Sequence, residues 1–206
     1  MPRQPTLIGN AVLLVIDIQG SAFLDNKADF GIPTMPGYQD NMRRALTVIR
    51  TARDIGMPTI YFQEAHRRDM IDFGRELDGA EGVHCLEGEP TTDLPTDITG
   101  QRDSDYFIRK RRYSCFFGTE LEILLKGLKA ETLILIGGMT DVCVHYTFVD
   151  GHQHDYYCRV VGDSVGGTSL AAQQASLNAM EYLQTGAVQS TEGMITAMHA
   201  HVAEAA

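Results

Sequence analysis

Cys143 is the residue of this 206-residue sequence whose type and position suit a nucleophile. An unbroken apolar run over 132–136 precedes it, as is typical of a strand buried on both faces, and two glycines follow that run. Thr140 and Asp141 then indicate a helix start. Cys143 is therefore predicted in the first helical turn, where free N–H groups and the helix dipole stabilise a thiolate. A buried, inert cysteine fits the same position, so position alone leaves both interpretations open.

Two charged residues are predicted to follow other buried strands. Asp17 ends the apolar run 11–16, and the basic run 109–112 follows a short strand predicted at 105–108. The carboxyl ends of parallel strands share one edge of a sheet, so an acid, a cation and a thiol can converge there. The carboxylate would take and return the thiol proton, while the ammonium lowers the thiol pKa. Taken alone, Asp17 could equally cap the next turn.

Strands and helices alternate along the whole chain. This order predicts one domain, 1–206, folded as a three-layer α/β/α sandwich around a mainly parallel sheet of about six strands. The irregular segment 79–104 is predicted to be an ordered excursion over that sheet. The predicted strands are 11–16, 58–62, 105–108, 132–136, 158–161 and 187–188. The predicted helices are 37–56, 119–128 with a capping box at Thr119–Glu122, 140–155, 169–184 and 191–203.

The composition excludes several classes of partner. A formal net charge of -10 argues against nucleic acid and against an anionic membrane surface. The N-terminus lacks the apolar core of a signal peptide, and no apolar run is long enough to span a bilayer. Four cysteines without a C-x-x-C pair fit free thiols, so we expect a soluble cytoplasmic protein. We interpret the other three cysteines, Cys85, Cys115 and Cys158, as packing residues.

Three blocks of sequence carry a resemblance to a known family. They are Asp17-x-Gln19, then Lys110-x-Arg112-Tyr113-Ser114-x-Phe116-x-Gly118-Thr119, then the stretch from Gly137 to Thr147. In this order, and with the alternation of strands and helices, they resemble the isochorismatase-like cysteine hydrolases over nearly the whole chain. The resemblance implies a catalytic triad of Asp17, Lys110 and Cys143. Lys110 alone among its basic neighbours has the family's spacing from Tyr113.

The resemblance implies further features of the site. The N–H groups of Met139 and Cys143 would form the oxyanion hole, beside a non-proline cis peptide between Gly138 and Met139. It also implies assembly as a homodimer or homotetramer. Cys143 favours the amidase branch, since true isochorismatases often lack this cysteine.

The segment 63–69 separates the branches of the family. Nicotinamidases carry an Asp-x-His…His metal set here, whereas this chain has one histidine, His66, and no matching partner in the segment. We therefore expect no metal, no cofactor and no nicotinamidase activity. The pattern Glu64-x-His66-Arg67-x-Asp69 instead is similar to that of biuret, triuret and related ureide hydrolases. A salt-bridged turn that orders the loop is the alternative.

These features predict a cysteine-dependent amidohydrolase that cleaves a small linear amide or ureide through a thioester. The alternatives are an isochorismatase-type vinyl-ether hydrolase and, in another class, a thiol sensor or binding protein on the same scaffold. We expect pocket walls from 20–37, including Phe30, and from 63–104. The candidate substrate contacts are Gln19, Phe23, Glu64, His66, Tyr113 and Phe116.

Two further features concern the surroundings of the site. Ala22 stands where the family often has an aromatic five residues after the aspartate, which leaves the role of Phe23 open. His145, His152 and His154 do not fall on one helical face as a metal pair would, so we interpret them as surface or interface residues.

Overall fold

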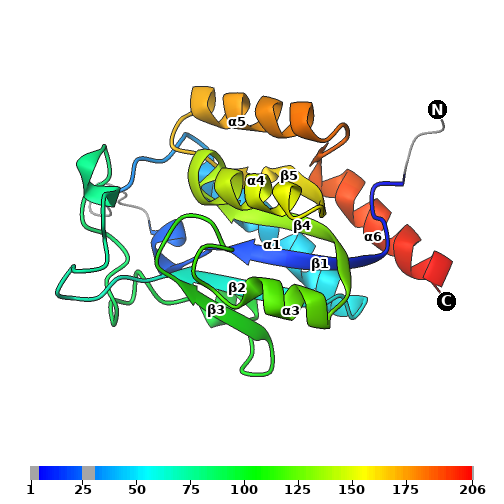
Figure 1. The fold of residues 1–206 in the computed structure, drawn as a ribbon, viewed down its shortest axis with the longest axis horizontal. Helices are drawn as coiled ribbons and strands as arrows, with labels where there is room; N and C mark the ends of the chain where they lie inside the picture. Colours follow the sequence, from blue (N-terminus) through cyan, green and yellow to red (C-terminus); the bar gives the residue numbers. More distant parts are fainter. Residues whose placement is uncertain (1–4, 25–30, 206) are drawn as a thin grey trace.

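Within residues 5–24 and 31–205, which the computed structural model describes, one six-stranded parallel sheet forms the middle layer (Figure 1). The strand order is β3-β2-β1-β4-β5-β6. The strands are β1 (Asn10–Ile16), β2 (Thr59–Glu64), β3 (Tyr106–Lys110), β4 (Ala130–Gly138), β5 (Tyr157–Gly166) and β6 (Val188–Gln189). The predicted parallel sheet of about six strands is confirmed.

Helices cover both faces of the sheet (Figure 1). One face carries α1 (Tyr38–Asp54) and α6 (Thr191–Ala205). The other carries α3 (Leu121–Gly127), α4 (His145–Gln153) and α5 (Leu170–Leu183). The shorter elements are η1 (Gly20–Phe23), η3 (Glu76–Asp78), α2 (Thr96–Thr99) and η4 (Thr140–Val144). The three-layer sandwich predicted from the sequence is therefore confirmed.

Burial on both faces explains the unbroken apolar runs of the central strands. In β1, Leu13 and Val15 belong to the core under α1 and α6, whereas Leu14 and Ile16 belong to the core under α3, α4 and α5. Alternate side chains of a strand point to opposite faces of the sheet. When helices cover both faces, every position of the strand is buried and therefore apolar. No helix of the described ranges combines the length and the apolar character that crossing a bilayer requires.

One helix start agrees with the prediction and one differs from it. The segment after β4 becomes helical at Thr140 with Asp141 in its first turn, as predicted, but this first turn, η4, is π-helical. The Asp141 carboxylate accepts hydrogen bonds from the backbone N–H and the hydroxyl of Thr168. The predicted capping box at Thr119–Glu122 is wrong, because α3 starts after Glu120 without a side-chain cap. The Thr119 hydroxyl accepts from Leu121 N at 3.2 Å and donates to Cys115 O at 2.5 Å.

The pairing of β1 with β4 depends on a glycine at position 137. Its φ is +113°, and a Cβ there would lie 1.9 Å from the carbonyl oxygen of Ile16. Only a residue without a side chain permits this approach. The end of β4, and the turn that carries Cys143, are set by this contact.

We predict that Gly137→Ala destabilises the protein by about 3 kcal/mol or more, since it combines a backbone clash with a left-handed φ. Chemical denaturation followed by circular dichroism measures the change. Gly127→Ala is the matched control, because a Cβ at Gly127 meets nothing within 4 Å. An equal response of the two variants would contradict the assignment.

Candidate active site

Four neighbouring strands deliver the polar groups of the site. Lys110 is the last residue of β3, Glu64 is the last residue of β2, and these two residues are register partners. Asp17 directly follows β1 with φ +51°, in the left-handed region that aspartate tolerates better than most residues. Cys143 lies in η4 after β4. The carboxyl ends of parallel strands thus bring the predicted groups to one edge of the sheet.

Lys110 is at the centre of this group. Its Nζ lies 2.8 Å from Asp17 Oδ2 and 2.6 Å from Glu64 Oε2, and it donates to Cys143 Sγ at 3.4 Å. The lysine side chain is fully buried. The three residues of the predicted triad therefore meet, and Glu64 joins them as a second carboxylate. The sequence analysis placed Glu64 only among substrate contacts.

Burial and charge give the two carboxylates different pKa values. Burial raises the pKa of Asp17 to about 6, because it outweighs the opposing effect of Lys110, and Glu64 adds to the rise. Burial acts on Glu64 in the same direction, but Lys110, His66 and His84 hold its pKa well below the usual value. Burial opposes the charge of Lys110, yet Asp17, Cys143 and Glu64 raise its pKa well above the usual value. Asp17 is thus the group that titrates near neutral pH.

The surroundings of Cys143 oppose the stabilising effect that a helix start has on a thiolate. Burial raises its pKa well above the usual value, and Glu64 and Asp17 add to that rise, whereas Lys110 opposes it. Each of Asp17, Glu64 and Cys143 offers an atom within 4.8 Å of the other two. The sulfur therefore needs a base before it can attack, and Asp17 is adjacent to it.

The peptide between Gly138 and Met139 is cis, as the family resemblance implied. The Met139 carbonyl accepts from Val142 N at 3.0 Å and from Val144 N at 3.1 Å, which fixes the turn that carries Cys143. Tyr38, which the sequence analysis did not single out, packs here: a Cβ on Gly138 would lie 2.4 Å from its hydroxyl. Tyr38 opens α1, so no local pattern linked it to this turn.

Both polar atoms of the Gln19 side chain form hydrogen bonds with backbone groups. Its Nε2 donates to Glu64 O at 3.0 Å and to Thr92 O at 2.5 Å, and its Oε1 accepts from Glu64 N at 3.1 Å. It therefore holds the end of β2 against the following loop, which is a positioning role rather than the expected substrate contact.

The three aromatic candidates are all held in packing contacts. Tyr113 donates to Glu81 Oε2 at 3.1 Å and stacks on Tyr146. Phe116 stacks on His154 at 5.1 Å, beyond the end of α4 opposite Cys143, so the structure does not support it as a substrate contact. Phe23 packs against the core on the α1 side, with Arg43 6.0 Å from its ring centre. Phe30 lies outside the described residues.

The remaining cysteines and histidines differ in their surroundings: Cys85 is partly buried and lines the cavity described below, and His145 is half-buried. All four cysteines are free, and Cys115 and Cys158 are buried. His152 Nδ1 lies 3.1 Å from Gln184 Nε2, and His154 stacks on Phe116. Over the described residues, these two histidines and His145 form no common metal-ligand group.

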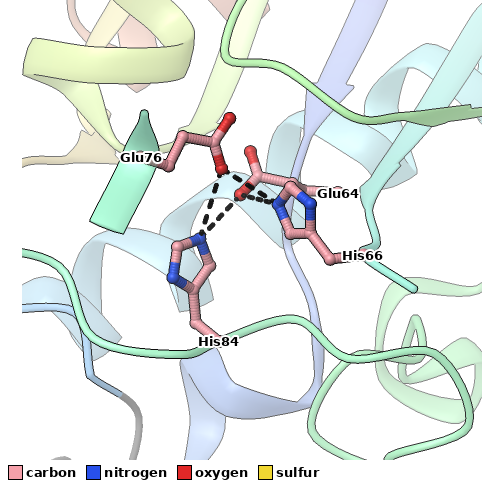
Figure 2. A group of neighbouring side chains, drawn as sticks. All are labelled: Glu64, His66, Glu76 and His84. Carbon is pink, nitrogen blue, oxygen red and sulfur yellow. Dashed lines mark hydrogen bonds and ion pairs between the residues drawn. The ribbon is translucent and has the colours of Figure 1, made fainter. Parts of the chain in front are cut away.

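His66 has a partner that the sequence analysis missed. Figure 2 shows Glu64, His66, Glu76 and His84 pointing toward one another. His66 Nε2 lies 3.0 Å from Glu76 Oε2 and 3.6 Å from Glu64 Oε1. His84 Nε2 lies 3.0 Å from Glu64 Oε1 and 4.0 Å from Glu76 Oε2. His84, outside the segment 63–69, is therefore the histidine partner that His66 lacks within it, and the expectation that no metal binds loses its basis.

These four residues, the EHEH cluster, fit a divalent cation. Their ligand atoms lie within 4.8 Å of one another, and all four side chains are buried. Both ring nitrogens of His66 and both carboxylate oxygens of Glu76 make no hydrogen bond. Ligands about 2.0–2.2 Å from a tetrahedral zinc ion would stand roughly 3.3 Å apart, close to the separations found. Burial opposes the charged form of His66, but Glu64 and Glu76 outweigh it and raise the pKa of His66 to about 9. When no cation is bound, a protonated His66 can therefore balance the charge of these two carboxylates.

A cavity of about 110 Å³ adjoins the EHEH cluster at His84. Both segments expected to form pocket walls contribute to it, 20–37 through Ser21 and Ile32 and 63–104 through Val83, His84, Cys85, Leu86, Glu89 and Thr91. A cavity of this size admits only a small molecule.

Comparisons with known proteins agree with this geometry. The model of the isochorismatase domain family matches residues 11–193. The chain belongs to the isochorismatase family. Among curated relatives, ureidoacrylate amidohydrolase RutB of Serratia proteamaculans is 28% identical over 205 residues, covering 86% of this chain and 81% of that protein.

Solved structures show the same fold. An isochorismatase-like hydrolase from Alkaliphilus metalliredigens superposes with a TM-score of 0.78 at 25% identity, covering 92% of this chain and 99% of that one. A pyrazinamidase of Pyrococcus horikoshii, solved in complex with zinc, superposes with a TM-score of 0.72 at 22% identity, covering 88% and 98%. The polar residues of the site therefore lie on a fold that this chain shares with these solved structures.

We predict that Lys110→Met destabilises the protein by about 3–5 kcal/mol, because it leaves Asp17 and Glu64 buried without their shared cation. Urea denaturation measures the loss. Lys126→Met is the matched control: Lys126 forms an exposed ion pair with Glu122, so little change is expected. A stable Lys110→Met protein would show that the ammonium does not hold the carboxylates together.

Proposed function

We propose that this chain is a cysteine-dependent amidohydrolase that cleaves a carbon–nitrogen bond of a small linear amide or ureide. The observation that carries the proposal is the meeting of Asp17, Lys110 and Cys143 beside the cis peptide at Gly138–Met139. The relatives named ureidoacrylate amidohydrolase support a ureide as the substrate class.

The reaction starts with a proton transfer. Asp17 takes the proton of the Cys143 thiol, and the sulfur attacks the substrate carbonyl carbon. The N–H groups of Met139 and Cys143 bind the resulting oxyanion. Lys110 compensates the negative charge that moves between Asp17 and the sulfur.

Two further steps complete the turnover. The C–N bond breaks, and the leaving nitrogen takes the proton from Asp17, which leaves a thioester on Cys143. Asp17 then deprotonates a water molecule that attacks the thioester, and the thiol and a carboxylic acid are released. The pKa of Asp17, about 6, suits a group that accepts and donates a proton at neutral pH.

The EHEH cluster would hold a divalent cation beside this triad. Glu64, His66, Glu76 and His84 would be its protein ligands. Such an ion supplies a Lewis acid and an ordered water ligand when it is bound. The proton transfers described above depend on Asp17, Lys110 and Cys143 alone. We also propose a cytoplasmic homodimer or homotetramer.

The first test is ammonia release from biuret, triuret, ureido acids, N-carbamoyl acids, maleamate and nicotinamide. We expect release from a ureide or linear amide, and a loss on the order of 10⁴-fold or more in Cys143→Ala. Cys158→Ala is the matched control, because this buried cysteine is the second residue of β5, at the other end of the sheet. Full ammonia release by Cys143→Ala would show that the sulfur is not the nucleophile, and silence with an unreactive Cys143 would favour a binding protein.

The second test is the pH dependence of kcat/KM. The base must be ionised, so activity should fall about tenfold per pH unit below the Asp17 pKa of about 6. Asp17→Asn should abolish activity at every pH. An acid limb centred near pH 4 would instead show that a carboxylate with an ordinary pKa is the base.

A further inference from the structure

Glu64 contacts both groups of polar residues in the site. Its Oε2 lies 2.6 Å from Lys110 Nζ and 3.5 Å from Cys143 Sγ. Its Oε1 faces the other way, 3.0 Å from His84 Nε2 and 3.6 Å from His66 Nε2. The residue is 4% exposed, so protein groups rather than solvent supply the partners of this carboxylate. One side chain thus joins the EHEH cluster to the triad.

We propose that Glu64 is a positioning residue through which a divalent cation in the EHEH cluster controls the reactivity of Cys143. The proposal rests on the proposed function only for the role of Cys143 as nucleophile. The new element is the link between the EHEH cluster and the triad, which is made by Glu64 and by none of the three triad residues.

Competition for one carboxylate is the physical basis of the link. A cation bound to Oε1 draws electron density and the side chain of Glu64 toward the cluster, which weakens its pairing with Lys110. The ammonium then acts more strongly on its other two partners, Asp17 and Cys143. The positive potential at the sulfur rises, and the sulfur becomes more reactive toward an electrophile.

Glu76 offers a matched comparison within the same cluster. It also contributes a buried carboxylate, with Oε2 3.0 Å from His66 Nε2. Its other oxygen lies 3.7 Å from Arg112 Nη1, and the contacts found for Glu76 include neither Lys110 nor Cys143. Removing either carboxylate therefore weakens the cluster, but only removal of Glu64 breaks the link to the triad.

The experiment measures the rate at which iodoacetamide alkylates Cys143. Manganese(II) is the probe cation, because carboxylate and imidazole suit it better than thiolate does. Chelator-treated and Mn²⁺-saturated proteins are compared at one pH, and mass spectrometry of the Cys143 peptide separates this site from Cys85. Electron paramagnetic resonance of free Mn²⁺ measures binding. The wild type is compared with Glu64→Gln and Glu76→Gln, each checked for folding by its thermal melt.

We expect Mn²⁺ to raise the wild-type alkylation rate about fivefold or more, the lower end of coupling between linked sites. Glu76→Gln should bind Mn²⁺ more weakly and show the same rise at saturation. Glu64→Gln should still bind Mn²⁺ through three ligands and show no rise. If Glu64→Gln does not fold, Glu64→Asp takes its place, because its shorter side chain cannot reach Lys110 and the EHEH cluster together. This variant should bind Mn²⁺ and show little or no rise in the alkylation rate.

Three results would overturn the link: no Mn²⁺ binding to the wild type, binding with an unchanged alkylation rate, or a full response in Glu64→Gln. Alkylation needs no substrate, so these results are independent of the amide panel. A protein that cleaves no amide but has a Mn²⁺-responsive Cys143 would keep the link and lose the proposed function.

Discussion

The buried ammonium of Lys110 is the charge around which the site is organised. A fully buried cation is costly unless anions surround it at hydrogen-bond distance, and here each anion comes from a different strand. Asp17 follows β1 and Glu64 ends β2, while β3 supplies the lysine itself. A parallel sheet with these strands side by side brings such residues together without a long loop. The fold and the charge pattern therefore constrain each other.

The two carboxylates that contact Lys110, Asp17 and Glu64, differ in pKa because their other neighbours differ. Glu64 also faces His66 and His84, and these imidazoles help to keep its pKa low despite its burial. The contacts of Asp17 within the described residues include no imidazole, and burial, with a contribution from Glu64, raises its pKa to about 6. Environments that push the pKa values of paired groups apart separate their roles. One carboxylate stays charged and holds the lysine, while the other is free to carry a proton.

Periodicity and strand ends made most of the fold and the place of the site predictable. The apolar runs marked the central strands and the sheet edge at which Asp17, the basic run 109–112 and Cys143 converge. The choice of Lys110 within that run, and the triad as a set, came from the resemblance to the family. Glu76 and His84 could not be found in this way, because they lie in an irregular segment whose path no period describes. That path is fixed by non-local contacts, such as the bonds of His66 N to Cys85 O and of Glu87 N to His66 O. The rise in the pKa of Cys143 could not be predicted from its place at a helix start for a similar reason, since burial and neighbouring carboxylates are properties of the assembled site.

The same irregular segment shapes both the cluster and the cavity. His84 is a member of the EHEH cluster and also lines the cavity of about 110 Å³. Gln19, two residues after Asp17, ties this segment to β2 through its bonds to Thr92 and Glu64. A change in the length of the segment would therefore alter the wall of the cavity and the contacts of Glu64 together. The cavity and the surroundings of Glu64 depend on this one loop, whereas the positions of Asp17, Lys110 and Cys143 depend on the sheet.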